Sequence, residues 1–407
     1  MAAIVALLFA AVLLLTAWYR DRAPAAPVSA AVTTSQGPTR PLFGTIDTGA
    51  AGVPAATPAR RQLVAQYQLV EQTLCSYEQA SQYPAGARPM AQNADQAYPN
   101  RPVTEANPMR LDDGGTDSQI LLQTSQSRVY MASGETVAFS LRAVDPSGTV
   151  LTLVIRRALA AGISYGNTRP GAPVTLAFTD DGQGADLVAN DGAWAGVLAP
   201  AQTGLAGFAG TIRTLVEYSV GGKSGKIAFD VIYSPTLPAV WTGAVREARE
   251  NGSLNFYLKA DVRMAGRYIV SGRVDDAQGR PFALLTFNDL LPAGPNEVRL
   301  SAFGKLLRDD APALPLTLRD VDGYLLRENA DPDRALMPRL EGNVATSRRY
   351  PLNGFSDAPY DGEERTRYLT EFGKDLKNAR EALLRDDPNA ALPASACAPA
   401  VDANTAR

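Results

Sequence analysis

The chain has 407 residues, of which 45% are hydrophobic, and its 39 basic and 42 acidic side chains leave a formal net charge of −3. This length is enough for two or three domains. The balanced charge provides no basic field of the kind that holds nucleic acid, so we expect no nucleic-acid partner. The chain has no histidine and only two cysteines, which excludes Ser-His and Cys-His catalytic arrangements and a structural zinc site with four Cys or His ligands.

Residues 1–19 carry no charged side chain and consist almost wholly of aliphatic residues. A membrane-spanning helix needs about 20 apolar residues, and Trp18 and Tyr19 lie where interfacial aromatic side chains belong. We therefore predict an uncleaved transmembrane anchor that attaches the chain to a membrane. The alternative is a signal peptide cleaved near Ala30, after a small-residue pattern that lies well beyond the apolar run.

The sequence gives two conflicting signals about membrane orientation. Arg20 and Arg22 follow the apolar run and no basic residue precedes it, so the positive-inside rule alone would leave the body in the cytoplasm. Long domains after an anchor weaken this rule, and a start codon assigned too far downstream would remove a basic leading segment. We expect the body to lie on the outer face of the membrane.

Three segments with different predicted structures lie between the anchor and the body. Residues 20–58 are rich in Ala, Pro, Thr, Ser and Gly, which predicts a flexible linker. Residues 59–80 are predicted to form an amphipathic helix that docks on the body rather than dimerising as a coiled coil, because apolar side chains recur every three or four residues: Leu63, Tyr67, Val70, Leu74 and Tyr77. Residues 81–117, with five prolines, are expected to be an extended connector.

Residues 118–235 show apolar side chains at every second position, which is typical of half-buried strands. The pattern is clear at 137–143 and recurs at 174–178, 212–218 and 227–233. Several short strands separated by turns predict a β-sandwich. The stretch 221–225 lacks the first glycine and the following helix of a phosphate-binding loop, so we expect a glycine-rich hairpin loop there.

A second β-sandwich is predicted over residues 236–347. Residues 254–262 alternate more regularly than any other stretch, and further strands are expected at 268–274, 282–287, 298–303 and 316–321. Asp-, Gly- and Pro-rich stretches at 275–279 and 292–295 supply the side chains that chain reversals need. The predicted chain is thus mostly β, with two tandem sandwiches of roughly 110 residues each.

A cluster of oxygen-bearing side chains within the first predicted sandwich is the one candidate metal site: Asp180, Asp181, Asp186, Asn190 and Asp191. Oxygen ligands interspersed with glycines suggest calcium. An EF-hand loop would need a bidentate Glu at its twelfth position, where this chain has Asp191. The alternative, which we favour, is that these residues build two tight turns by accepting local backbone hydrogen bonds.

These turns, with Gly182, Gly192 and Trp194, resemble a motif that recurs in bacterial extracytoplasmic Ig-like modules. The second predicted sandwich, through residues 266–268, 296–307 and 316–321, resembles proteins labelled "choice-of-anchor X". The resemblance extends over residues 118–345 and implies Ig-like folds and attachment to the bacterial envelope, without any established activity. It implies a periplasmic body if the inner-membrane anchor is kept, or an exported or secreted protein after cleavage near Ala30.

The C-terminal segment, residues 348–385, is predicted to hold a connector and an amphipathic helix over 363–385. Docking of this helix on the body is expected, and binding of a partner is the alternative. The tail, 386–407, is Ala-, Pro- and Asp-rich and is predicted to be disordered except near Cys397. In an exported body, Cys75 and Cys397 can form a disulfide that joins the two terminal segments, and two free thiols are the alternative.

Two functional hypotheses remain open. The first is a non-enzymatic, membrane-anchored envelope protein whose β modules bind a protein or a glycan, because the chain has an anchor and no catalytic signature. The second is a carboxylate-dependent enzyme such as a glycosidase, which needs no histidine. Asp261, Asp275 and Asp320 lie on predicted strands or turns, where solvated surface charge is the ordinary explanation, and no catalytic role is assigned to them.

Overall fold

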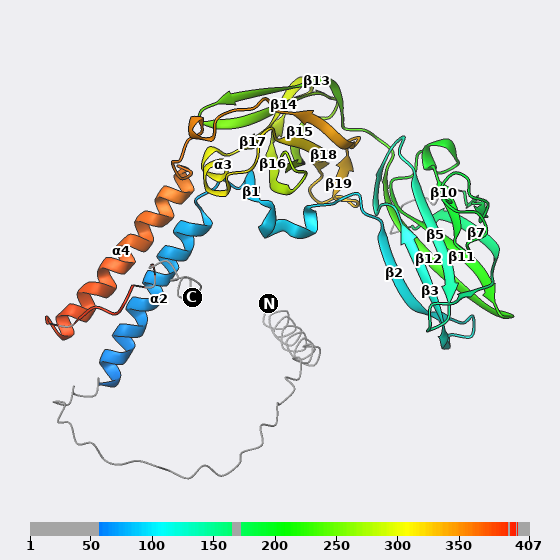
Figure 1. Cartoon of the computed structure of the whole chain (residues 1–407), viewed down its shortest axis with the longest axis horizontal. Helices are drawn as coiled ribbons and strands as arrows, with labels where there is room; N and C mark the ends of the chain where they lie inside the picture. Colours follow the sequence, from blue (N-terminus) through cyan, green and yellow to red (C-terminus); the bar gives the residue numbers. More distant parts are fainter. Residues whose placement is uncertain (1–56, 165–171, 390, 396, 398–407) are drawn as a thin grey trace, which may run out of the picture. The chain divides into compact units, whose positions relative to one another are not determined.

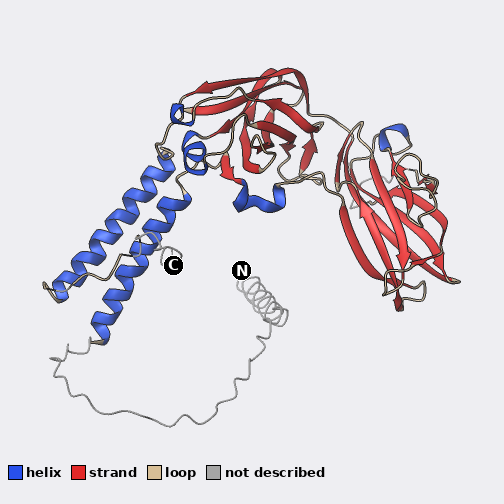
Figure 2. Ribbon diagram, in the orientation of Figure 1, coloured by secondary structure: helices blue, strands red, loops and turns tan. Residues whose placement is uncertain are grey.

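A computed structural model describes residues 57–164, 172–389, 391–395 and 397 (Figure 1). The predicted anchor, 1–19, and the predicted linker up to residue 56 lie outside these residues. The described residues belong to one compact unit that is mostly β, with four sheets and two long helices (Figure 2). This confirms the predicted mostly-β class. Within the described residues, no helix combines the length and apolar character needed to cross a membrane.

The first β module, residues 103–234, consists of two sheets that share one hydrophobic core. Its first sheet has the strand order β2-β3-β5-β10-β9, with β6 paired to β5, and its second has the order β4-β12-β11-β7-β8. The elements are β2 (Val103–Arg110), β3 (Thr116–Gln126), β4 (Tyr130–Ala132), β5 (Val137–Val144), β6 (Val150–Leu151), β7 (Leu153–Gly162), β8 (Val174–Thr175), β9 (Phe178–Thr179), β10 (Trp194–Leu198), the short 3-10 helix η2 (Pro200–Gln202), β11 (Gly210–Val220) and β12 (Lys223–Ser234).

The alternating runs of the sequence become the inner faces of these sheets. Val137, Phe139 and Leu141 on β5 are buried, and Phe139 meets Phe229 of the opposite sheet with ring centroids 4.8 Å apart. Strands β11 and β12 are joined by the two-residue turn 221–222, whose glycines both have positive φ, +56° and +79°. A type of turn that requires positive φ at two consecutive positions favours glycine, so the predicted glycine-rich hairpin is observed in a shorter form.

One predicted strand of this module is wrong in detail. Residues 174–178 form two short pieces instead of one strand: Val174 pairs with Ala160 in the second sheet, whereas Phe178 pairs with Gly196 in the first. The segment crosses from one sheet to the other. Leu176 and Phe178 remain buried in the shared core, which explains why the apolar alternation of a continuous strand is present in the sequence.

The second β module consists of residues 87–89 and 239–346, again with two sheets around one core. One sheet has the order β1-β16-β15-β18-β19, with β20 paired to β18, and the other has the order β13-β14-β17. The elements are β1 (Ala87–Pro89), β13 (Ala239–Glu250), β14 (Ser253–Val262), β15 (Gly266–Asp275), β16 (Pro281–Leu291), β17 (Gly294–Ala302), α3 (Gly304–Asp310), β18 (Thr317–Leu326), β19 (Arg334–Leu336) and β20 (Leu340–Thr346), with the 3-10 helices η1 (Met90–Gln96) and η3 (Leu352–Gly354) outside them.

The predicted connector, residues 81–117, needs correction because it contains two strands, β1 and β2, that pair with the β modules. Strand β1 joins the second module, with Arg88 opposite Leu284 on β16. Strand β2 joins the first module, with Glu105 opposite Thr124 on β3. The chain therefore enters the second module at β1, forms the whole first module, and returns to the second module at β13. The first module is an insertion within the chain of the second.

Helix α2 (Pro58–Ala80) packs against helix α4 (Glu363–Asp386), and both lie close to the predicted ranges. Tyr77 of α2 makes edge-to-face contacts with Tyr368 and Phe372 of α4, at centroid distances of 5.5 and 5.3 Å. At the other end of the pair, Arg60 lies 3.4 Å from the carboxylate of Asp386. The two helices run antiparallel, and each helix covers the apolar stripe of the other.

The structure joins Cys75 of α2 to Cys397 of the tail in a disulfide, with the two Cα atoms 5.4 Å apart. The Ser395 hydroxyl donates a hydrogen bond of 2.9 Å to the buried carboxylate of Glu71 on the same helix. The end of the chain is thus bound to a helix that lies 322 residues earlier in sequence. Both cysteines are paired, so neither is a free thiol in this structure.

We predict that breaking this disulfide releases the tail without unfolding the β modules. Removal of a native disulfide costs about 2–5 kcal/mol in small secreted domains, and here the destabilised parts are α2 and the tail residues 391–395 and 397. In Cys397→Ser, limited proteolysis followed by mass spectrometry should show new cleavage after Asp387, while fragments of both β modules stay intact. Cys75→Ser should give the same pattern. Equal protection of the tail before and after reduction would contradict this prediction.

Candidate functional site

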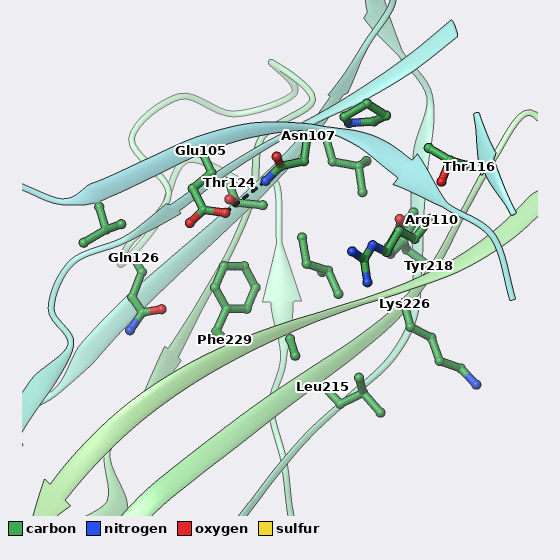
Figure 3. Close-up of a pocket in the computed structure, with 15 residues that line it drawn as sticks. Glu105, Asn107, Arg110, Thr116, Thr124, Gln126, Leu215, Tyr218, Lys226 and Phe229 are labelled. Atoms are coloured by element: carbon green, nitrogen blue, oxygen red, sulfur yellow. Dashed lines mark hydrogen bonds between the residues drawn. The ribbon is translucent and has the colours of Figure 1, made fainter. Parts of the chain in front are cut away.

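A cleft of about 590 Å³ opens on one side of the first β module, between β2 and β3 on one wall and β11 and β12 on the other (Figure 3). The register of β2 and β3 places Val103 opposite Gln126, Glu105 opposite Thr124, and Asn107 opposite Leu122. Directly opposed residues of antiparallel strands project to the same face, so all six side chains line this wall.

This wall is more polar than the inner face of a two-sheet module usually is. Glu105, Asn107, Thr124 and Gln126 occupy positions at which alternation would place apolar side chains. The Asn107 amide donates a hydrogen bond of 3.0 Å to the carboxylate of Glu105 (Figure 3). These carboxylate, amide and hydroxyl groups offer both donors and acceptors to a ligand.

The opposite wall provides an apolar floor, formed by Ile227 and Phe229, whereas Leu215 lies on the outer face of β11 at the rim. Tyr218 also lines this wall; it is 0% exposed, and its hydroxyl has no hydrogen-bond partner among the described residues. Burial, reinforced by the negative charge of Asp112, raises the pKa of Tyr218 to about 12. The hydroxyl therefore keeps its proton at neutral pH and is a hydrogen-bond donor without an acceptor.

The cleft is a wedge between two strand edges that meet at one end. A β-bridge joins Leu111, just after β2, to Gly225 on β12, and the Asp112 amide donates to the Ser224 carbonyl over 3.3 Å. Farther along β12, the Gln126 side chain donates to the Asp230 carbonyl at 2.8 Å. Between these two points, β2 and β12 each lack a strand partner on the edge that faces the cleft.

Three charged side chains line the cleft: Glu105, Arg110 and Lys226. Arg110 is exposed and, within the part of the chain that the structure describes, makes no ion pair, whereas Lys226 lies 3.7 Å from Asp112. Glu105 is the one carboxylate among the described residues that line the cleft. Glycoside hydrolysis of the usual kind needs two carboxyl groups flanking the scissile bond, so this lining provides half of the required pair.

The candidate calcium ligands divide into two groups in the structure. Oxygens of Asp180, Asp186 and Asp191 all lie within 4.8 Å of one another. Asp181 instead accepts a hydrogen bond from the Gln183 amide at 3.0 Å, and Asn190 adopts a left-handed conformation with φ of +59°. Three converging carboxylates have the chemistry to hold a cation.

Backbone amides already use these carboxylates. Asp180 accepts from the amides of Asp191 and Gly192, at 3.1 and 3.0 Å. Asp186, which is buried, accepts from Gly182 at 2.6 Å and from Val188 at 3.3 Å. Such bonds are what Asp-rich turns are expected to make, and they account for the loop without a metal ion.

The other carboxylates that the sequence singled out do not form a catalytic pair. Asp275 and Asp320 both bind the guanidinium of Arg319, at 2.6 and 2.7 Å. Arg319 is only 7% exposed, so these two carboxylates neutralise a buried cation. Asp261 lies exposed on β14.

The cleft could not be predicted from the amino-acid sequence. Its first wall belongs to β2, which was interpreted as part of a connector, and to the end of β3. The one signal that could have indicated a strand here is the period of two in Val103, Glu105 and Asn107, but two of these three side chains are polar. A half-buried strand is recognised by apolar alternation, so a strand with a polar inner face escapes recognition.

Comparison with known proteins gives distant similarities. No family model and no curated protein matches the chain. A DUF4785 family protein from Legionella pneumophila is 14% identical over 56% of this chain and 57% of its own, with a TM-score of 0.37. The adhesin InvE of Yersinia pseudotuberculosis is also 14% identical, over 53% of this chain and 58% of its own, with a TM-score of 0.16. This chain therefore spans a little over half of these proteins, and the similarities assign no function.

We predict that Tyr218→Phe and Tyr268→Phe have different effects on the free energy of unfolding. Both hydroxyls are buried in residues that are 0% exposed, but only that of Tyr268 is near acceptors, the carbonyls of Pro238 at 3.0 Å and Met264 at 2.7 Å. Loss of a buried hydrogen bond costs about 1–3 kcal/mol. Urea denaturation should show that loss for Tyr268→Phe and no loss for Tyr218→Phe. Equal destabilisation would mean that the Tyr218 hydroxyl has a partner in solution.

Proposed function

We propose that this chain is a membrane-anchored, non-enzymatic protein of the bacterial envelope, and that the cleft of the first β module binds a protein or glycan partner. The observation that carries the proposal is the cleft itself, which combines an apolar floor with donors and acceptors on the wall. Binding sites usually have this combination of concave shape, apolar surface and a few convergent polar groups.

Within this proposal, the two β modules are Ig-like sandwiches, as the resemblance to choice-of-anchor X proteins implies. Two observations support it: each module has two sheets around one core, and almost all strand pairs are antiparallel. The apolar segment 1–19 is the membrane anchor of the proposed protein, and the body lies in the periplasm. Cleavage near Ala30, which would release the body, is the alternative.

The disulfide supports an extracytoplasmic body. Cys75 and Cys397 are the only cysteines of the chain, and the fold brings them together from opposite ends. Disulfides persist in oxidising compartments such as the periplasm and are rare in the cytosol. The proposal includes no cofactor, since backbone amides account for the Asp-rich turns.

We predict that a tag placed after Arg407 is digested by protease once the outer membrane is opened, before the cells are lysed. An anchored body on the outer face of the inner membrane is exposed at that stage, whereas a cytoplasmic body is not. A cytoplasmic marker protein, which must survive until lysis, provides the control. Protection of the tag until lysis would place the body in the cytoplasm and contradict the proposed location.

We predict that Thr124→Trp prevents the full-length chain from binding isolated envelope material of its source cells. Thr124 points into the cleft, where an indole fills space that a ligand needs. The matched control is Ser125→Trp, one residue along β3, because successive side chains of a strand point to opposite faces. Binding should fall by at least about tenfold, or 1.4 kcal/mol, in the first variant alone. Equal binding by both variants, with unchanged melting curves, would exclude the cleft as the binding site.

A further inference from the structure

We propose, building on the function above, that the partner is a protein and that the cleft binds an extended segment of it. The segment adds as a strand to the edge of β12 at Ala228 and places a carboxylate side chain near Arg110. Recognition of this kind uses main-chain hydrogen bonds for affinity and side-chain contacts for specificity.

The free edge of β12 carries the first part of this inference. The Ile232 amide donates to the Val129 carbonyl at 2.8 Å, and the Asp230 carbonyl accepts from Gln126 at 2.8 Å, both on the side away from β11. Alternate residues of an antiparallel strand direct both main-chain polar groups to the same edge. Ala228 therefore directs its N–H and C=O to that edge as well, and it is exposed and lines the cleft.

The facing edge of β2 is a poorer template. Pro108 lies on this strand, and proline has no N–H to donate. Proline on an edge strand is one of the ways in which proteins prevent unwanted pairing. Of β2 and β12, it is therefore β12 whose edge offers an open main-chain donor and acceptor, those of Ala228, to an incoming segment.

The charge of Arg110 indicates the character of the segment. Arg110 extends into the cleft (Figure 3) and, among the described residues, has no carboxylate partner, so an acidic side chain is the complementary group.

The lining favours a peptide over a sugar. The aromatic residues of the cleft, Tyr218 and Phe229, are 0% and 5% exposed. Neither presents a ring face on which a sugar could stack, so a glycan would depend on the polar wall alone. An extended peptide can use the polar wall and the open main chain of Ala228 together.

The experiment selects ligands from a displayed library of random peptides of about twelve residues, long enough to cover the strand edge, on the immobilised full-length chain. The best peptide is synthesised, and its affinity is measured by fluorescence anisotropy. Ala228→Pro removes the edge N–H and should weaken binding at least about tenfold, whereas Ala228→Ser keeps it and should change binding less than about twofold. Arg110→Glu should weaken binding of acidic peptides by a similar factor, and circular dichroism verifies that each variant is folded.

A second measurement needs no protein variant. Main-chain N-methylation of the peptide, one residue at a time, should weaken binding at the residue whose N–H pairs with the Ala228 carbonyl and leave it unchanged at the residues on either side, because successive residues of a strand direct their N–H groups to opposite edges. Loss of binding at one residue between two insensitive neighbours indicates main-chain pairing with the strand edge, and side-chain recognition alone does not produce it.

Three results would overturn the inference. They are failure to enrich any peptide, peptide binding that Ala228→Pro and Arg110→Glu leave unchanged, and peptide binding that N-methylation weakens at no residue. Soluble glycan fragments of the cell wall are tested in parallel against Thr124→Trp and Ser125→Trp. Glycan binding that only Thr124→Trp abolishes would overturn the peptide inference and leave the proposed function standing, whereas the absence of any cleft-dependent binding would overturn both.

Discussion

The burial of Arg319 is the constraint on which the connection between the two β modules depends. Its guanidinium, only 7% exposed, donates to the carboxylates of Asp275 and Asp320 and, at 2.8 Å, to the main-chain carbonyl of Ala97. A buried charge whose partners are removed destabilises a protein by about 3–5 kcal/mol. Arg273, 3% exposed, imposes the same requirement on the segment through a 3.0 Å bond to the carbonyl of Gln96. Two buried cations therefore hold the segment between β1 and β2 against the second module.

This attachment fixes the position from which the first module begins. The Asn100 side chain donates to Asp320 at 2.9 Å and accepts from Arg339 at 3.2 Å, and β2 starts three residues later, at Val103. Because β2 is an edge strand, its one strand partner is β3. The wall of the cleft that β2 forms is thus tied at its start to the ion network of the second module. Because the first module is inserted in the second, the geometry of the candidate site depends on contacts in the second module as well as in the first.

The elements that could be predicted from the sequence are those whose apolar pattern is visible within a short, continuous stretch of the chain. Residues 254–262 alternate without a break and form β14, and the stripe of α2 recurs with a helical period, so both are visible locally. Strand β1 has three residues, one of them Pro89, which is too short for any period to show. Strand β2 has Glu105 and Asn107 on its inner face, which hides the apolar signal of a strand. The cleft was beyond prediction because it depends on which edges meet, and the bridge between Leu111 and Gly225 joins residues that no local pattern relates.

The short length of the free edge limits what pairing on β12 can contribute. The bridge at Gly225 closes one end of it and the bond from Gln126 to Asp230 closes the other, so the main chain of Ala228 offers one donor and one acceptor between them. Each such hydrogen bond contributes about 0.5–1.5 kcal/mol net, which is far below the roughly 8 kcal/mol of a micromolar complex. Most of the affinity must therefore come from side chains that enter the cleft and reach Arg110, Gln126 and the apolar floor. A strand edge of this size aligns a ligand, and the cleft beside it selects which ligand is bound.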